Sequence, residues 1–163
     1  MVIYDMTPEQ CRKALGHEGF GRLACALRNE PYIVPVEFVY EGEYLYGFSS
    51  VGQKVEWMRV NPCVCVEIDA VTRRDQWLSV IVTGLYEELP DTPESDEKVL
   101  EAYELIRKRS LWWQPGYVSA LHRDPSQLPT PVFYRIRIEK ITGRRAFPDP
   151  IEAAAAGYGG GPA

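Results

Sequence analysis

One stretch of the sequence, Pro31–Pro62, constrains the fold more than any other part of the chain. It reads PYIVPVEFVYEGEYLYGFSSVGQKVEWMRVNP. The run Tyr32–Tyr40 is rich in β-branched and aromatic residues, Glu41–Glu43 is typical of a turn, and Tyr44–Ser49 returns as a second strand. A helical pattern follows over Gly52–Asn61, where an Asn-Pro pair ends it. The stretch therefore predicts a β-hairpin that runs directly into a short helix.

The corner between the return strand and this helix has the composition of an anion-binding site. Its sequence is Ser49–Ser50–Val51–Gly52–Gln53–Lys54. Backbone N–H groups in the first turn of a helix lack intrahelical partners, and the helix dipole makes that end positive. The two serines add hydroxyl donors and Lys54 adds a charge. The alternative is an ordinary corner in which Ser49 or Ser50 caps the helix.

Pro35 interrupts the first strand of the hairpin. Proline has no N–H to donate to a neighbouring strand. The sequence therefore predicts an edge or a bulge at Pro35, or a place where something other than a strand, such as a planar ligand, lies against the backbone.

The rest of the chain adds further strands and two more helices. Thr7 and Gln10 have the spacing of a capping box, which predicts a helix over Pro8–Leu15 that Gly16 ends. Ser95–Lys108 also has helical spacing. The six predicted strands are Gly19–Arg28, Tyr32–Tyr40, Tyr44–Phe48, Cys63–Ala70, Trp77–Leu89 and Val132–Ile141.

The order of these elements predicts a mainly β fold. The strands follow one another as hairpins with no βαβ alternation, which favours an antiparallel barrel or sandwich with helical connections. Trp77–Leu89 is nearly continuous in apolar residues and is expected to be buried on both faces, with a bulge at Gly84. Val132–Ile141 is expected to end at Gly143. The 163 residues suit one domain, residues 1–150, followed by a loose Ala/Gly-rich tail, residues 151–163.

Composition argues against several classes of protein. A net charge of −5 argues against a general nucleic-acid binder. No apolar run is long enough to span a membrane, and the N-terminus lacks the pattern of a signal peptide. Four cysteines, at positions 11, 25, 63 and 65, match no zinc-site spacing, so we expect no metal site and the reduced thiols of a cytoplasmic protein.

The sequence carries none of the common catalytic motifs. It has no nucleophile elbow, Walker A loop, dinucleotide fingerprint or HExxH pair. The carboxylates Glu37, Glu56, Glu67 and Asp69 are expected to be solvated or ion-paired. Catalytic residues are therefore not assigned, and if the protein is an enzyme, a cofactor is expected to carry the chemistry. Trp112 and Trp113 are expected to be buried against this chain, a partner or a ligand.

Five segments in order carry a family resemblance: GRLACAL, PYIVPVEFVY, YLYGFSSVGQKVEWMRVNPCVCVEID, WLSVIVTG and RIRIEKITGRR. With these segments the chain resembles the flavin-binding split β-barrel superfamily typified by pyridoxine 5′-phosphate oxidase. It is closer to the smaller branch of that superfamily, which includes nitroimidazole-resistance proteins. The resemblance covers roughly Gly19–Glu88 and, more weakly, Val132–Arg144. It implies a six-stranded antiparallel split β-barrel.

The resemblance also implies a homodimer with FMN at the subunit interface. The backbone of Val34–Val36 would lie along the flavin ring, Phe48–Ser50 would continue toward the ribityl chain, and Gln53–Lys54 would hold the phosphate. The full set of cofactor-binding residues that it implies is Val34, Pro35, Val36, Phe48, Ser49, Ser50, Gln53, Lys54, Ser79, Trp77 and Trp113.

Two departures from the oxidase pattern stand out. Gln53 stands where the oxidases have arginine, which leaves one formal charge at the phosphate instead of two. The chain ends its last strand with GRRAFPDP instead of the Arg-Leu-x-Pro segment that helps hold the vitamin. The resemblance therefore implies a cytoplasmic FMN-dependent oxidoreductase of another small molecule. The alternatives are a non-catalytic flavin, deazaflavin or haem binding or stress protein, and a purely structural dimeric barrel.

Overall fold

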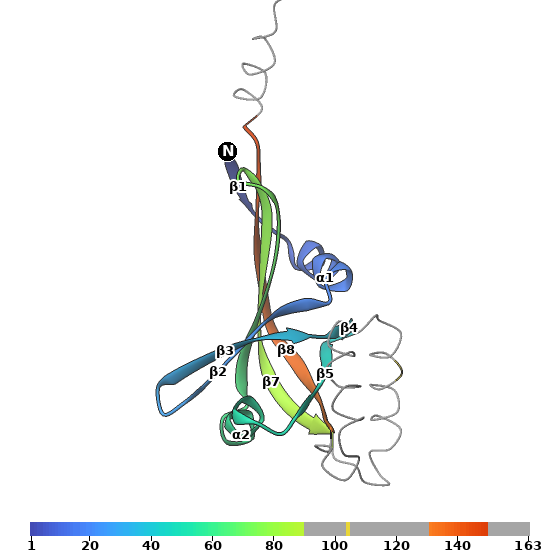
Figure 1. Cartoon of the computed structure of the whole chain (residues 1–163). Coiled ribbons are helices and arrows are strands. Elements are labelled where there is room, and N and C mark those ends of the chain that lie inside the picture. The colour runs from blue at the N-terminus through green and yellow to red at the C-terminus, as the bar shows by residue number, and fades with distance from the viewer. Residues whose placement is uncertain (90–103, 105–130, 150–163) are drawn as a thin grey trace, which may run out of the picture.

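The computed structural model describes residues 1–89, residue 104 and residues 131–149 (Figure 1). The predicted helix Ser95–Lys108, both Trp112 and Trp113, and the tail lie outside the described residues. The described elements, in chain order, are β1 (Val2–Asp5), α1 (Pro8–His17), β2 (Phe20–Leu27), β3 (Glu30–Glu37), β4 (Val39–Glu41), β5 (Tyr44–Ser50), α2 (Gln53–Val60), β6 (Cys63–Arg73), β7 (Gln76–Leu89) and β8 (Pro131–Phe147).

These strands form one antiparallel sheet of eight strands in the order β3-β2-β6-β7-β8-β5-β4, and β1 pairs with the end of β8. The mainly β, antiparallel class is therefore confirmed. Eight strands replace the six predicted because β1 was not anticipated and because the predicted strand Tyr32–Tyr40 divides into β3 and β4. The two outer strands, β3 and β4, do not pair with each other in the described part of the chain, so the sheet stays open.

The longest strands, β7 and β8, form a twisted ribbon through the length of the molecule (Figure 1). β1 lies at the upper end of this ribbon and α2 lies near its lower end, with α1 between them. None of the described helices is both long and apolar enough to cross a membrane.

Alternation along the central strands assigns one face of the sheet to the core. Val64, Val66 and Ile68 of β6 and Val80 and Val82 of β7 are all at most 3% exposed. Because successive strand residues point to opposite faces, the residues between them point away from this core. One of these, Ile81, is 44% exposed, so the expectation that β7 is buried on both faces is wrong for a single chain.

Both helices pack on the core face. Cys11 and Leu15 of α1 and Val55 and Met58 of α2 are each 0% exposed and belong to the same cluster as the strand residues. The capping box of α1 is confirmed, since the Thr7 N–H donates to Gln10 Oε1 at 3.0 Å and the Gln10 N–H donates to Thr7 Oγ1 at 3.3 Å. The helix ends at His17 instead of Leu15.

Gly143 continues β8 instead of ending it. It pairs with Val80, and β8 runs on to Phe147. A Cβ at this position would lie 2.8 Å from Cys11 Sγ and 3.0 Å from the Met6 sulfur. Glycine is therefore needed here because α1 and the chain before it approach the sheet closely, and the residue marks a close contact within a strand.

An irregularity is present at Gly84 as predicted, but its extra residue, Glu139, lies in the partner strand β8 and not in β7. The register between β7 and β8 shifts between Thr83 and Gly84. A Cβ on Gly84 would clash with the Arg137 carbonyl oxygen and would come within 2.8 Å of Ile136 Cγ2. The two strands can lie this close at the bulge because residue 84 has no side chain.

We expect Gly84→Ala to lower the free energy of unfolding by about 1–3 kcal/mol, because the added methyl group meets the backbone of β8. Chemical denaturation measures this. Gly16→Ala is the matched control, since its nearest neighbour lies 4.0 Å away and alanine favours the helix by up to about 1 kcal/mol. Equal stability of the two variants would contradict the close approach at Gly84.

Candidate functional site

The first turn of α2 has no side-chain cap. Its N-cap residue is Gly52, and the first helical hydrogen bond joins the Glu56 N–H to the Gly52 carbonyl at 3.0 Å. Ser49 Oγ donates to the Ser50 carbonyl at 2.8 Å. The alternative in which a serine caps this helix is therefore wrong. Among the described residues, no side chain caps the N–H groups at residues 53–55. These groups lie at the positive end of the helix dipole and can therefore bind another acceptor.

Lys54 places a charge beside these N–H groups. Its side chain is half-buried, and burial lowers the pKa of the ammonium group below its ordinary value of 10.5. The Cys25 thiol on β2 is near enough to act in the opposite direction. No described carboxylate forms an ion pair with Lys54. A half-buried cation without a counter-charge is destabilising unless an anion binds it.

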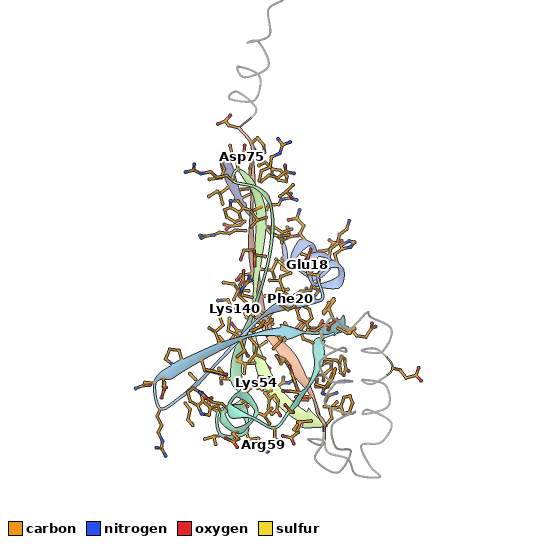
Figure 2. The ribbon with its side chains drawn as sticks, viewed as in Figure 1. Glu18, Phe20, Lys54, Arg59, Asp75 and Lys140 are labelled. Atoms are coloured by element: carbon orange, nitrogen blue, oxygen red, sulfur yellow. The ribbon has the colours of Figure 1, made fainter. Side chains whose placement is uncertain are left out.

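α2 is fixed against the sheet by contacts along its other end. The Arg59 guanidinium binds both carboxylate oxygens of Glu88 on β7, each at 2.7 Å. The Asn61 side chain donates to the Ala26 carbonyl on β2 at 2.9 Å. The rings of Trp57 and Tyr32 lie 5.7 Å apart. These contacts fix the second half of α2 against β2, β3 and β7. Figure 2 shows Lys54 and Arg59 on this helix.

The predicted residues of β3, Val34–Val36, lie on an outer strand of the sheet. Val36 is 8% exposed, and Val34 packs against the same core. Pro35 points to the opposite face, where it pairs with Arg22, and it is exposed. Among the described strands, β3 pairs only with β2, so of the three predictions for Pro35 the edge strand is the one observed. Its outer backbone edge is unpaired among the described strands.

The predicted residues of β5 lead into the same corner. Phe48, Ser49 and Ser50 pair with Phe133, Val132 and Pro131 of β8. Only residues 51 and 52 separate β5 from α2, so chain connectivity holds the two serines near Gln53 and Lys54. Gln53 and Ser50 are exposed.

Ser79 and Trp77 do not lie at this corner within one chain. Lys54 lies by Cys25, which is next to Ala24, and the register runs from Ala24 to Cys65 to Thr83. Four residues of β7 separate Thr83 from Ser79, which is about 13 Å. In Figure 2, Asp75, just before β7, lies at the upper end of the ribbon, and Lys54 lies near its lower end.

The face of the sheet also separates them. Cys25 belongs to the core, whereas Ser79 alternates with buried Val80 and points to the other face. Trp113 lies outside the described residues, so its predicted role is untested. The structure therefore places Ser49, Ser50, Gln53 and Lys54 in one corner between β5 and α2, with Lys54 near β2, and places Trp77 and Ser79 elsewhere.

The sequence did not predict that several polar residues on the outer face form one charged network. Arg22 of β2 binds Glu67 of β6 at 3.2 Å and also binds Asp69. Ser79 Oγ donates to Glu67 Oε1 at 3.1 Å. The expectation that Glu67 and Asp69 are ion-paired is confirmed. Their two-residue spacing shows that they share a face, but the partner strand and register are not readable from the sequence.

A cavity of about 650 Å³ opens near this network. Its lining comes from β1, the start of α1, β7 and β8, and includes Asp5, Met6, Trp77, Ser79, Thr142 and Arg144. The sequence singled out Trp77 and Ser79 but gave no signal for the rest, because β1 was not predicted and β8 was expected to end before Arg144.

The chain is similar to several known proteins. A family model described as pyridoxamine 5′-phosphate oxidase matches residues 7–145. An uncharacterised protein of Rhizobium meliloti is 36% identical over 146 residues, covering 90% of this chain and 97% of that protein.

Two solved structures share the fold. A FAD-binding protein of Mesorhizobium loti is 40% identical, has a TM-score of 0.74, and is matched over 99% of its chain and 90% of this one. A protein of Bacteroides thetaiotaomicron that is described as a 5-nitroimidazole antibiotic resistance protein is 17% identical, with a TM-score of 0.63. That match covers 89% of each chain.

We expect Lys54→Met to stabilise the ligand-free protein by about 0.5–2 kcal/mol, because it removes a poorly solvated charge for which the described residues provide no counter-charge. Denaturation at several pH values measures this. Because the pKa of Lys54 is lowered in the folded state, the unfolded chain binds more protons between the two pKa values.

The free energy of unfolding of the unsubstituted protein should therefore rise with pH across that window, and Lys54→Met should remove this rise. Lys13→Met on the exposed face of α1 is the control and should change neither quantity. A Lys54→Met protein that is less stable at all pH values would contradict the absence of a counter-charge.

Proposed function

Because the chain belongs to the pyridoxamine 5′-phosphate oxidase family, we propose that it binds FMN and acts as a flavin-dependent oxidoreductase on a small molecule. The observation that carries this proposal is the start of α2. An uncapped helix N-terminus and a half-buried Lys54 without a described counter-charge meet there, and β3 is an outer strand of the same sheet. This arrangement suits a phosphate group joined to a flat ring.

Each part of the corner has a role in holding the cofactor. The N–H groups of the first turn of α2 and the Lys54 ammonium group bind the terminal phosphate. Ser49 and Ser50 lie just before the first turn of α2 in the chain, and their hydroxyl groups then bind the polyhydroxylated chain of the cofactor. The open backbone edge of β3 near Pro35 then accepts the ring. These contacts position the flavin and neutralise its phosphate, and the bound flavin supplies the two-electron chemistry.

The same residues also bear on FAD and haem as alternative cofactors. The Mesorhizobium loti relative is described as FAD-binding. A single formal charge at the corner, with Gln53 exposed beside it, suits one phosphate group better than a diphosphate. Haem has less support, since His17 is exposed at the end of α1 and His122 lies outside the described residues.

We also propose that two copies of the chain complete the site. Ser79 and Trp77 lie on the face opposite to Lys54 and about 13 Å along the sheet, so a single flavin does not reach both sets within one chain. The outer face carries exposed apolar side chains, including Ile33 at 62% and Ile81 at 44%. Pairing of this face with a second copy buries them and brings Ser79 of one copy to the flavin of the other.

We expect Lys54→Ala to weaken FMN binding by about 1–3 kcal/mol, because a charge-assisted hydrogen bond is lost. Quenching of flavin fluorescence on titration measures this, and Lys13→Ala is the matched control. FMN affinity of the unsubstituted protein should fall as pH rises through the lowered pKa of Lys54. Gln53→Arg should strengthen binding. Unchanged affinity in Lys54→Ala would place the phosphate elsewhere, and stronger binding of riboflavin than FMN would remove the phosphate site.

We expect Ile33→Asp to convert a dimer into a folded monomer with at least tenfold weaker FMN binding, because it places a charge in the proposed interface. Sedimentation at several concentrations measures the mass. Val60→Asp is the control, because Val60 is 69% exposed on α2 and outside this face. A monomeric unsubstituted protein that binds FMN fully would overturn the shared site.

A further inference from the structure

Hydrogen bonds across three strands of the outer face connect Arg22, Glu67 and Ser79. Arg22 of β2 donates to Glu67 Oε2 at 3.2 Å, and Ser79 Oγ of β7 donates to Glu67 Oε1 at 3.1 Å. Each oxygen of the Glu67 carboxylate therefore accepts from a different strand. We propose that Glu67 is a positioning residue, which fixes Ser79 as a hydrogen-bond acceptor for a ring N–H group of the flavin held by the second copy. This inference rests on the proposed function.

The direction of the Ser79 hydrogen bond decides what its hydroxyl group offers to a ligand. A serine hydroxyl has one proton to donate and two lone pairs that accept. The proton of Ser79 is directed to Glu67, because an ionised carboxylate accepts hydrogen bonds and donates none. The lone pairs remain for a ligand, and Ser79 lines the cavity of about 650 Å³ beside this network. In the proposed dimer the flavin ring of the other copy lies on this side.

Arg22 keeps the Glu67 carboxylate in this orientation. Its guanidinium group can only donate, so it holds one carboxylate oxygen and leaves the other to Ser79. Arg22 is itself held by Asp69, the residue that pairs with Ser79 across β6 and β7. The side chains of Glu67 and Asp69 are only 30% and 34% exposed in one chain. Pairing with a second copy excludes further water that would compete for the Ser79 hydroxyl, and thereby strengthens the network.

A hydroxyl group that only accepts suits particular edges of a flavin ring. Oxidised flavin has an N–H group at N3, whereas its N5 atom is an acceptor. Reduction adds a proton to N5 and turns this acceptor into a donor. Ser79 therefore binds either N3–H, in both redox states, or N5–H, in the reduced state alone. In both cases the acceptor contributes to the binding of reduced flavin, and the affinity for oxidised flavin distinguishes the two.

Titration of the full chain with oxidised and with reduced FMN tests the role of Ser79. We expect Ser79→Ala to weaken the binding of reduced FMN at least about fivefold, because the acceptor is lost. Ser79→Thr keeps the hydroxyl group and should restore this affinity. An equal loss for oxidised FMN identifies N3–H. A loss confined to reduced FMN identifies N5–H and lowers the reduction potential of the bound flavin, by about 30 mV for a tenfold loss.

Glu67→Gln tests the positioning role. A glutamine side chain has one acceptor oxygen, and because Arg22 cannot accept, the amide nitrogen of this variant faces Ser79. Ser79 then accepts from residue 67 and turns its proton toward the flavin. We expect Glu67→Gln to weaken the binding of reduced FMN at least about fivefold. Asp69→Asn is the matched comparison, since it removes the same charge from the same network and leaves the Ser79 partner in place, and it should not weaken binding.

The two carboxylate substitutions separate hydrogen bonding from charge. Loss of a negative charge near an anionic cofactor favours binding in both variants, so equal effects of Glu67→Gln and Asp69→Asn would overturn the positioning role. A loss in Ser79→Ala confined to oxidised FMN would also overturn it, because that result is expected of a serine that donates to N5. Unchanged affinity in Ser79→Ala and Glu67→Gln would overturn this inference alone if the unsubstituted dimer binds FMN. An unsubstituted protein that binds no FMN would overturn the proposed function as well.

Discussion

The strict two-residue alternation of β6 and β7 is the constraint on which the rest of the structure depends. It assigns Val64, Val66, Ile68, Val80 and Val82 to a single core face that both helices cover. Every residue between them is thereby directed to the opposite face, whatever its chemistry. That face holds charged groups, hydroxyls and an exposed isoleucine, and no described element of this chain packs across it as the helices pack across the core. The alternation thus separates a core face, which both described helices cover, from an outer face of mixed charged, polar and apolar side chains.

The start of α2 shows how a site can be maintained at some expense of stability. Val55 and Met58 are fully buried and hold the helix on the core, and Arg59 with Glu88 fixes its far end. These contacts keep the first turn in place even though no side chain caps it. Lys54, half-buried beside that turn, adds a charge that packing alone would not favour. By our proposal, both features occur together at this helix start because they bind the phosphate of the cofactor.

The sequence was sufficient to predict features that depend on local chemistry. The capping box at Thr7 and the short helix after Gly52 follow from residue types at fixed spacing, and the structure confirms them. The hairpin is confirmed only where Val39–Glu41 pairs with β5, because the earlier part of its first strand, β3, pairs with β2. It was insufficient where a distant contact decides the outcome. Gly143 looks like a strand end, but it lies inside β8 because Cys11 and Met6 come within 3.0 Å of where its side chain would be.

The same distinction decides which parts of the candidate site could be predicted from the sequence. Ser49, Ser50, Gln53 and Lys54 are consecutive or nearly so, so their proximity could be inferred from the sequence. Arg22, Glu67 and Ser79 meet only through the register of three strands, and register is set by the whole sheet.

That difference has a consequence for how the site works. The residues that hold a phosphate by our proposal are local, and they remain together in any state in which α2 is formed. The outer-face residues meet only when β2, β6 and β7 are in register, and they lie on the side that faces away from α2. A ligand that contacts both groups therefore binds only when the whole sheet is formed and, in the proposed dimer, when a second copy is present. Binding of the ring is then coupled to assembly, whereas capture of the phosphate is not.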